Sequence, residues 1–492
     1  MFKTFLRVTS VFQHKARSPV ARERRILDKQ EIWRGKASSD SKGRDPVWPL
    51  VLVVVFGSYL FIDFASLFHT PEVINAAIAS GPSTSPLPNT RNVETAPQSK
   101  PYNDTRRGAD AKDETKKNQA TPFVKGPLAN LDKVIITLTK GAVSLKTIPT
   151  FKNLLLGKFA SISQRNELIF YTLDPKLQRA ADQIVSKARA PHIAVVAMNP
   201  KTGQVLAISE KSVSIPNLSL YAKFPAASLF KLVTAAAALE KSTVDPYSPI
   251  KFRGGTYTLN RWNYLPNPRA DRRHMHLAEA LGRSCNVIFA RVAMKYLNPQ
   301  VLSQYAQLFG FNSSLGFDLP LVPSTATFPI GDPFELGRSA AGFGEITLSP
   351  IHAATLVSGI ANAGMMPKPI IVDRVVDGSG TILYKSSPQI LTRVMESSSA
   401  KKLLEMMKLT TTIGTSKSEF SKRRDKTLQG ITVAAKTGTL TGTYPEGVNH
   451  WFVAAAPLED PKIAVAVIVV NPGRGGAKAS RIGREMLNAY FQ

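Results

Sequence analysis

Cysteine is almost absent from this chain, in which Cys285 is the only one among 492 residues. A single thiol excludes any disulfide within the chain, and it leaves the cellular compartment undecided. Metal ligands are not clustered either: no cysteine or group of carboxylates accompanies the histidine pair His274 and His276 at ligand spacing. We therefore expect no metal and no cofactor, and we interpret both histidines as exposed loop residues.

Acidic side chains are scarce relative to basic ones. The chain has 63 Lys and Arg against 35 Asp and Glu, which gives a formal net charge of +28. Such a charge suits nucleic acid, anionic lipid or an anionic wall polymer as a partner. Because the basic residues are spread along the chain and no nucleic-acid-binding motif accompanies them, we expect a membrane or wall partner and no nucleic acid.

An apolar run near the N-terminus predicts a membrane anchor. Residues 47–62 carry no charge, and extended to Phe68 the run reaches the length that spans a bilayer. The basic residues 1–46 predict a single span at 47–68, with the N-terminus in the cytoplasm and the rest on the extracytoplasmic (periplasmic) side of the inner membrane. A signal cleaved near 77–79 is the alternative, although the long leader favours an uncleaved anchor.

Composition divides the remaining chain into three parts. Residues 69–125 are rich in Pro, Ser, Thr, Asn, Lys and Asp, which predicts a flexible linker. Apolar content returns over residues 126–170, which we interpret as a small pedestal too short to be an enzyme by itself. The main domain is expected over residues 171–492, where Asp174 and Pro175 predict the N-cap and the first residue of a helix.

Short apolar runs separated by turns predict one sheet built from both ends of the main domain. Two strands are expected early and three late, around a mostly helical stretch from about residue 276 to 364. A last helix is expected near the C-terminus. This order predicts an α/β domain of the α+β type. The five expected strands cover residues 193–198, 205–208, 431–436, 451–456 and 463–470.

Ser228 and Lys231 form the first candidate site. They lie in an Ala- and Leu-rich run after Pro225 that predicts a buried helix, and their spacing places a hydroxyl and an amine on one helix face. A lysine amine kept partly neutral by burial or by a nearby cation accepts the proton of a serine hydroxyl, and a helix N-terminus offers free N–H groups to a developing negative charge. Chance produces the same spacing in Ser39 and Lys42, so a helix N-terminal serine with a snorkelling lysine is the ordinary structural explanation.

Ser284 and Asn286 form the second candidate site. Side chains two residues apart diverge in a helix or a strand, but at a tight turn both can point into one cleft. Ser284 can then pass a proton between Ser228, Lys231 and a leaving amine, and the Asn286 amide can donate to a substrate carbonyl. The alternative is structural, with Ser284 as the N-cap of a helix over residues 287–296.

The segment Lys436–Thr439 follows an expected strand and forms the third candidate site. Lys436 supplies a fixed positive charge that can hold a carboxylate and can lower the pKa of Lys231 by repulsion between like charges. Gly438 allows the backbone to approach a ligand closely, and the Thr439 N–H can then be an oxyanion donor.

A second Lys-Thr-Gly triplet, at residues 201–203, has a simpler explanation. It follows Asn199 and Pro200 between two expected strands, so a hairpin turn explains it fully. We therefore take Lys436 and not Lys201 as the functional lysine.

Together the three segments resemble the signature of penicillin-binding proteins and class A β-lactamases, in which Ser-x-x-Lys, Ser-Asp-Asn and Lys-Thr-Gly occur in this order. Here they are Ser228–Lys231, Ser284–Asn286 and Lys436–Gly438. The resemblance to the transpeptidase domain of penicillin-binding proteins covers roughly residues 171–492. Further similar segments lie at residues 172–178, 341–350, 361–364, 413–415 and 435–439.

The resemblance implies a serine acyl-transferase with a central antiparallel sheet, flanking helices and a helical subdomain. It implies a D,D-transpeptidase that cross-links peptidoglycan stem peptides and is inhibited by β-lactams. Ser228 would attack the penultimate D-alanyl carbonyl, release D-alanine and pass the acyl group to an amine of a neighbouring strand. Lys231 would be the base, and Ser284 would relay protons.

The same resemblance assigns the binding residues. Asn286 and Thr439 would hold the substrate amide, whereas Lys436 and Thr437 would hold the terminal carboxylate. The N–H groups of Ser228 and Thr439 would bind the oxyanion.

Other functions remain open at this stage. Residues 70–165 are too few for the glycosyltransferase domain of the bifunctional family members, so a separate glycosyltransferase or another cell-wall complex is the expected partner. A D,D-carboxypeptidase releases the same D-alanine. A β-lactamase needs a base that activates water, for which Glu335 and Glu345 are the candidates. A catalytically silent wall-binding scaffold is the remaining alternative.

Overall fold

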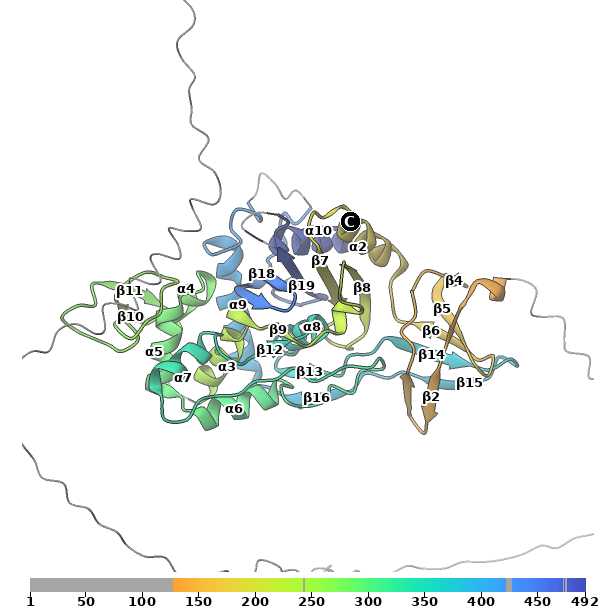
Figure 1. Cartoon of the computed structure of the whole chain (residues 1–492), viewed down its shortest axis with the longest axis horizontal. Helices are drawn as coiled ribbons and strands as arrows, with labels where there is room; N and C mark the ends of the chain where they lie inside the picture. Colours follow the sequence, from red (N-terminus) through yellow and green to blue (C-terminus); the bar gives the residue numbers. More distant parts are fainter. Residues whose placement is uncertain (1–126, 242–243, 422–426, 472, 474–475) are drawn as a thin grey trace, which may run out of the picture. The chain divides into compact units, whose positions relative to one another are not determined.

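The computed structural model describes most of the chain after residue 126 (Figure 1). The expected leader (1–46), anchor (47–68) and linker (69–125) lie outside this part. Over the described residues, no helix combines the length and the apolar character that a bilayer crossing needs. The described residues are 127–241, 244–421, 427–471, 473 and 476–492.

A five-stranded antiparallel sheet forms the centre of the main domain, in the order β17-β18-β19-β7-β8. Two of its strands come early in the sequence and three come late, so the sheet joins both ends of the domain as predicted. The mixed α/β class is thereby confirmed. One boundary differs: β17 covers 434–443 and not 431–436, so the segment Lys436–Thr439 lies within this strand and does not follow it. The strands are β7 (His192–Met198), β8 (Val205–Ser212), β17 (Ala434–Thr443), β18 (Glu446–Ala456) and β19 (Ile463–Asn471).

Helices bury both faces of this sheet. Helices α2 (Pro175–Lys187) and α10 (Ala479–Phe491) pack on one face, and α8 (Pro350–Ala361) packs on the other (Figure 1). Alternate side chains of β19 belong to two separate apolar clusters, one under each helical layer. Because side chains of a strand alternate between its faces, a continuous apolar run fills both layers. As predicted, Asp174 caps α2 by accepting hydrogen bonds from two backbone N–H groups, and Pro175 is its first residue.

The helical region lies mainly between β8 and β17 in sequence, as predicted. One detail differs: the helix expected directly after Pro225 begins later, and Ser228 lies in a preceding 3-10 turn, η4 (Ala227–Leu229). Ala227 has a left-handed backbone (φ 50°), which an α-helix does not accommodate. The remaining helices are α3 (Lys231–Lys241), α4 (Leu277–Gly282), α5 (Asn286–Tyr296), α6 (Pro299–Leu308), α7 (Pro333–Ala340) and α9 (Ser397–Thr412).

A second, six-stranded sheet contains the expected pedestal segment, in the order β1-β5-β6-β14-β15 with β4 paired to β5. Two of its strands, β14 and β15, come from beyond the helical region, so the pedestal segment does not form this sheet alone. The Thr172 hydroxyl, which donates to the Val205 carbonyl at 2.7 Å, ties β6 to the central sheet. The strands are β1 (Asp132–Val134), β4 (Leu154–Leu155), β5 (Lys158–Ser163), β6 (Leu168–Tyr171), β14 (Val372–Val376) and β15 (Ile382–Lys385).

Among the described residues, four two-stranded sheets complete the fold. One of them overturns the expectation for the two histidines. His274 and His276 lie in a strand, β11, and not in a loop. The His276 Nδ1 accepts the Glu279 N–H at 3.0 Å and so caps α4. Over the residues that the structure describes, no group of three or more His, Cys, Asp or Glu is placed to hold a metal ion. The pairs are β2 (Ile136–Thr139) with β3 (Ala142–Leu145), β9 (Phe224–Pro225) with β12 (Thr347–Leu348), β10 (Pro249–Phe252) with β11 (Arg273–His276), and β13 (Met365–Pro367) with β16 (Ile390–Arg393).

The ends of α4 and α9 meet at a pair of glycines. A Cβ atom on Gly414 would lie 2.1 Å from the Gly282 carbonyl oxygen, and one on Gly282 would lie 2.8 Å from the backbone of Leu409. The Thr415 N–H donates to the same Gly282 oxygen at 3.1 Å. The absence of both side chains therefore permits a backbone contact that holds Thr415 close to the turn containing Ser284.

Gly414→Ala is expected to destabilise the protein, because the added methyl group meets backbone atoms that cannot rotate away. Overpacking of this kind costs about 2 kcal/mol in the free energy of unfolding. Gly378→Ala is the matched control, since a Cβ atom there meets nothing within 4 Å. Urea unfolding of the two variants measures the difference, and equal stabilities would contradict the proposed contact.

Candidate active site

The three sequence-predicted segments line one cleft of about 810 Å³. Ser228 enters it from η4, Ser284 from the turn between α4 and α5, Asn286 from the start of α5, and Thr437 to Thr439 from β17. The Lys231 and Lys436 side chains are completely buried behind this surface. The structure thus brings all eight predicted residues into one region.

Lys231 lies at the centre of a hydrogen-bonded group. Its Nζ is 2.8 Å from the Ser228 Oγ, 2.8 Å from the Asn286 Oδ1 and 2.6 Å from the Ala341 carbonyl oxygen. These three oxygen atoms match the three N–H groups that the amine carries when it is charged. Its burial therefore leaves no donor without a partner. Ala341 is not among the residues predicted for the site, although its segment, residues 341–350, resembles the family in sequence.

Burial lowers the pKa of Lys231 from its usual 10.5 to about 7. The amine is therefore largely neutral just above neutral pH and able to accept the proton of a hydroxyl 2.8 Å away. The sequence left two causes open for this shift, burial and repulsion by a nearby cation such as Lys436. Burial is the main cause for Lys231, whereas the repulsion between the two amines contributes to the lowered pKa of Lys436.

The backbone before Ser228 is held in a strained form. Ala227 is left-handed (φ 50°), a conformation that is unfavourable for a residue with a Cβ atom. Gly342 lies against it so closely that a Cβ atom on Gly342 would be 2.0 Å from the Ala227 carbonyl oxygen. This contact packs the turn after α7 directly beneath the nucleophile, and the strain accompanies a candidate functional residue, as it often does.

Ser284 also has a left-handed backbone (φ 58°) and lies outside the helix. The alternative in which it caps α5 is wrong, because Cys285 occupies the N-cap position and caps without its side chain. The Ser284 Oγ accepts a hydrogen bond from the Lys436 Nζ at 2.9 Å. Over the described residues, its side chain is hydrogen-bonded to neither Ser228 nor Lys231. The hydrogen-bond partner of Ser284 for proton transfer is therefore Lys436 and not Lys231.

Lys436 is the other buried cation of the site. Burial, followed by repulsion from the Lys231 charge, lowers its pKa well below the usual value. Besides Ser284, its Nζ donates to the Thr437 carbonyl oxygen at 2.6 Å. A carboxylate bound beside these two amines would favour their charged forms, so the pair suits an anionic ligand.

Thr415 joins the site although it was absent from the candidate residues. Its hydroxyl is 2.6 Å from that of Thr437, and both line the cleft. The sequence offers one signal for Thr415, because it lies in the segment 413–415, which resembles the family. Two adjacent hydroxyls at the rim can donate to one carboxylate.

Gly438 and Thr439 form the β17 edge of the cleft. A Cβ atom on Gly438 would lie 3.3 Å from the Ala227 Cβ and 3.4 Å from the Ser228 backbone nitrogen, so β17 passes close to the nucleophile. Thr439 is paired in the β17–β18 ladder with His450, whose Nδ1 is 3.5 Å from the Thr439 hydroxyl. Burial lowers the pKa of His450, which also lines the cleft.

The alternative triplet at residues 201–203 is a hairpin turn, as predicted. The Asn199 N–H donates to the Gln204 carbonyl at 2.9 Å across the turn. Lys201 is exposed and pairs with Asp460 at 2.8 Å. This lysine therefore contributes to the surface and not to the cleft.

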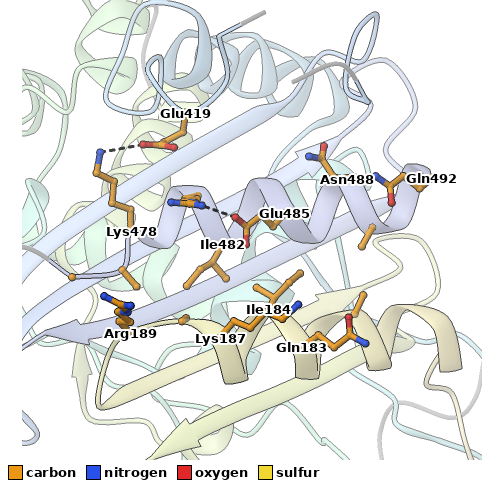
Figure 2. Close-up of a pocket in the computed structure, with 16 residues that line it drawn as sticks. Gln183, Ile184, Lys187, Arg189, Glu419, Lys478, Ile482, Glu485, Asn488 and Gln492 are labelled. Carbon is orange, nitrogen blue, oxygen red and sulfur yellow. Dashed lines mark hydrogen bonds and ion pairs between the residues drawn. The ribbon is translucent and has the colours of Figure 1, made fainter. Parts of the chain in front are cut away.

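A second cleft of about 850 Å³ lies beside α2 and α10 (Figure 2). Ion pairs of Lys478 with Glu419 and of Arg481 with Glu485 neutralise part of its charge. None of the eight predicted residues lines it. Because no serine, threonine or cysteine is among the described residues that line it, this cleft is the weaker candidate for nucleophilic chemistry despite its larger volume.

A serine with a buried, partly neutral lysine at hydrogen-bond distance defines a serine acyl-transfer site. The family model described as the penicillin-binding protein transpeptidase domain matches residues 193–488. The chain therefore belongs to this family.

Several members with established names are similar to the chain. Peptidoglycan D,D-transpeptidase PbpA of Mycobacterium tuberculosis is 29% identical over 370 residues, which cover 65% of this chain and 72% of that protein. Stage V sporulation protein D of Bacillus subtilis is 27% identical over 326 residues, with coverages of 61% and 49%. The ceftriaxone acyl-enzyme complex of penicillin-binding protein A from M. tuberculosis has 25% identity and a TM-score of 0.53, with coverages of 68% and 80%.

Proposed function

We propose that this chain is a peptidoglycan D,D-transpeptidase that forms an acyl-enzyme at Ser228 and is inhibited by β-lactams. The observation that carries the proposal is the Lys231 amine, which is fully buried, has a pKa of about 7 and lies 2.8 Å from the Ser228 Oγ. Two relatives support the same reaction. One is PbpA of M. tuberculosis, which is named a peptidoglycan D,D-transpeptidase, and the other is penicillin-binding protein A of that organism in its ceftriaxone acyl-enzyme complex.

In the acylation step, the Ser228 Oγ attacks the penultimate D-alanyl carbonyl and its proton passes to Lys231. The oxyanion that forms is stabilised by the N–H groups of Ser228 and Thr439, which the close approach of β17 to η4 supports. The C–N bond then breaks and D-alanine leaves. Its nitrogen takes a proton from Ser284, which regains one from Lys436 at 2.9 Å.

The substrate is held by its amide and its terminal carboxylate. The Asn286 Nδ2 and Thr439 contact the amide, whereas the paired hydroxyls of Thr415 and Thr437 contact the carboxylate. Lys436 contributes its charge from beneath, and a bound carboxylate would raise its lowered pKa back towards the usual value. An amine of a neighbouring strand finally attacks the ester carbonyl and gives its proton through Ser284 to Lys436. The ester bond to Ser228 then breaks, and Lys231 returns its proton to the Ser228 oxygen.

Two features disfavour a β-lactamase. That reaction needs a base aimed at a water molecule beside the acylated serine. Neither Glu335 nor Glu345 lines the cleft, and Glu335 is paired with Arg338 at 2.8 Å on the surface of α7. The two glutamates considered as bases are therefore engaged elsewhere, with Glu345 close to Thr327.

The expected anchor at residues 47–68 and linker at 69–125 suit this activity. A single span would hold the enzyme in the cytoplasmic membrane with residues 127–492 on the extracytoplasmic side, where peptidoglycan is assembled. Because residues 70–165, between the expected anchor and the main domain, are too few for a glycosyltransferase domain, we propose that a separate glycosyltransferase or cell-wall complex supplies the glycan strands.

A fluorescent penicillin is expected to label the full-length protein covalently, and Ser228→Ala is expected to abolish the label. Lys231→Ala should retain non-covalent binding while lowering the acylation rate by roughly 10²–10⁴-fold, the usual range for loss of a general base. Gel fluorescence over time measures both. Rapid loss of label with hydrolysis of the drug would indicate a β-lactamase, and a folded protein that never labels would indicate a silent scaffold.

The acylation rate is expected to rise with pH and to level off above about 7, the pKa of Lys231. Only the neutral amine accepts the Ser228 proton, so the rate should fall about tenfold for each pH unit below that value. Rate constants for penicillin acylation between pH 5 and 9 test this prediction. A midpoint close to the ordinary lysine value of 10.5 would remove Lys231 from the role of base.

Removal of residues 1–68 is expected to release a soluble protein that labels with penicillin at the full-length rate. The described residues contain every proposed catalytic group, and no bilayer-spanning helix occurs among them. Fractionation of membranes and supernatant, followed by labelling, provides the measurement. Retention of the truncated protein in the membrane would contradict the single-anchor proposal.

A further inference from the structure

A segment outside the three signature motifs fixes the Asn286 amide. The Asn286 backbone N–H donates to the Thr256 carbonyl at 2.9 Å, and its Nδ2 donates to the Tyr257 carbonyl at 2.7 Å. Its Oδ1 accepts from the Lys231 Nζ at 2.8 Å. Asn286 is therefore held from two sides, by Lys231 and by the connection from β10 to β11.

This connection, residues 253–271, contains neither helix nor strand. Connections of this length without regular structure need other bonds to keep one conformation. Apolar packing fixes it only in part: Leu259 and Tyr264 pack against the rest of the protein, but Tyr257 and Trp262 are 64% and 60% exposed. Polar contacts therefore contribute to the conformation that presents the Thr256 and Tyr257 carbonyls.

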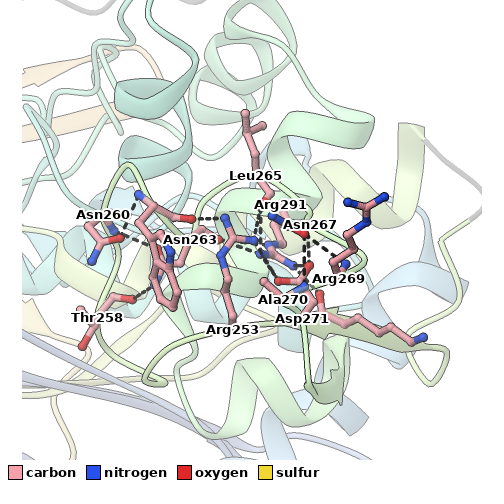
Figure 3. Close-up of polar contacts among 12 residues, drawn as sticks. Arg253, Thr258, Asn260, Asn263, Leu265, Asn267, Arg269, Ala270, Asp271 and Arg291 are labelled. Atoms are coloured by element: carbon pink, nitrogen blue, oxygen red, sulfur yellow. Dashed lines mark hydrogen bonds and ion pairs between the residues drawn. The ribbon is translucent and has the colours of Figure 1, made fainter.

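Arg291 and Asp271 provide these contacts (Figure 3). The Arg291 guanidinium forms a two-point ion pair with the Asp271 carboxylate, at 2.7 and 3.0 Å, and it also donates to the carbonyls of Asn263 and Leu265 at 2.8 and 2.9 Å. Arg253 donates to the same carboxylate at 3.0 Å. One buried cation thus joins the middle and the end of the connection.

The ion pair is charged at neutral pH. Burial raises the pKa of Asp271, but hydrogen bonds from Arg291, the Asn267 N–H and Arg253 outweigh it and lower the pKa to about 2. Arg291 and Asp271 are only 4% and 7% exposed. A buried ion pair is weak evidence of added stability, whereas its fully hydrogen-bonded geometry suits a role in holding one conformation.

Helix α5 links this network to the active site. It carries Asn286 in its first turn and Arg291 farther along, so one rigid element holds both the proposed substrate contact and the cation that organises the connection. Movement of residues 253–271 relative to α5 would break the bonds of the Thr256 and Tyr257 carbonyls to Asn286.

We propose that Arg291 and Asp271 are positioning residues for acylation, which fix residues 253–271 so that the Asn286 amide, and through it the Lys231 amine, keep their reactive orientation. The proposal rests on the proposed function, because it assigns the network a role in that reaction. We expect the Arg291–Asp271 ion pair to affect the acylation rate more than the initial binding of the ligand. The proposed contacts to the ligand carboxylate, Thr415 and Thr437, lie on other elements and should stay in place.

The test uses the full-length protein and a fluorescent penicillin, with binding and acylation resolved by stopped-flow. Arg291→Lys keeps the charge but loses the two-point geometry. We expect the first-order acylation rate constant at saturation to fall about tenfold, as for a small misplacement of reacting groups. The dissociation constant of the preceding non-covalent complex should change less than about threefold. A wild-type rate constant in the folded variant, or a loss confined to binding, would overturn the proposal.

Val292→Ala is the matched control on the same helix. It removes apolar contacts from the core, where Val292 is 1% exposed, without touching the ion pair. We expect a lower melting temperature and an unchanged acylation rate constant. If Val292→Ala slows acylation as much as Arg291→Lys does at a similar melting temperature, the effect is general destabilisation and the proposal fails.

A double-mutant cycle identifies the route of the effect. If Arg291 acts through Asn286, Arg291→Lys should lower the acylation rate constant less than about twofold further in an Asn286→Ala background, because the interaction is already lost. Independent, multiplicative losses would refute this route. Asp271→Asn replaces Arg291→Lys in the cycle if the latter does not fold. Failure of the wild type itself to acylate would refute the proposed function, which distinguishes the two failures.

Discussion

Burial of the Lys231 amine is the constraint on which the rest of the site depends. A lysine in water is almost fully protonated at neutral pH and cannot accept a proton from serine. Removed from water, Lys231 has a pKa of about 7, and its three neighbours satisfy its hydrogen-bond donors. The Ala-rich face of α3, which places the amine inside the core, is therefore part of the chemistry. A buried lysine without hydrogen-bond partners would destabilise a protein, whereas the hydrogen-bonded Lys231 is the proposed base.

Close backbone contacts make this burial possible. Gly342 lies directly against Ala227, and Gly414 lies against Gly282, at distances that leave no room for a side chain. These contacts join elements far apart in sequence around a cleft whose two lysines are both withdrawn from solvent. Ala227 and Ser284, which both have a left-handed backbone, also line this cleft. The packing energy of the large surrounding core maintains these locally unfavourable conformations.

Two groups of residues contribute to the reactive geometry in different ways. The signature residues provide the nucleophile, the amines and the amide that face the cleft. A second group, centred on the Arg291–Asp271 ion pair, contacts neither Ser228 nor Lys231 but fixes the carbonyls to which Asn286 donates. A single contact does not fix the orientation of an amide. The reactive geometry therefore also depends on polar contacts outside the three motif segments.

The amino-acid sequence by itself determined the local features: the presence and order of the five central strands, though not the bounds of β17 and β18, the N-cap at Asp174, the hairpin at residues 201–203 and the three motif segments. Each depends on neighbouring residues, through alternation, capping or turn preference. Only the tertiary structure decided that Ser228 lies in a 3-10 turn, that Ser284 contacts the second lysine, that Thr415 joins the site and that burial lowers the pKa of Lys231. It also decided that two late strands complete the second sheet. These features arise from contacts between residues far apart in the chain, and local sequence patterns carry no information about such distances.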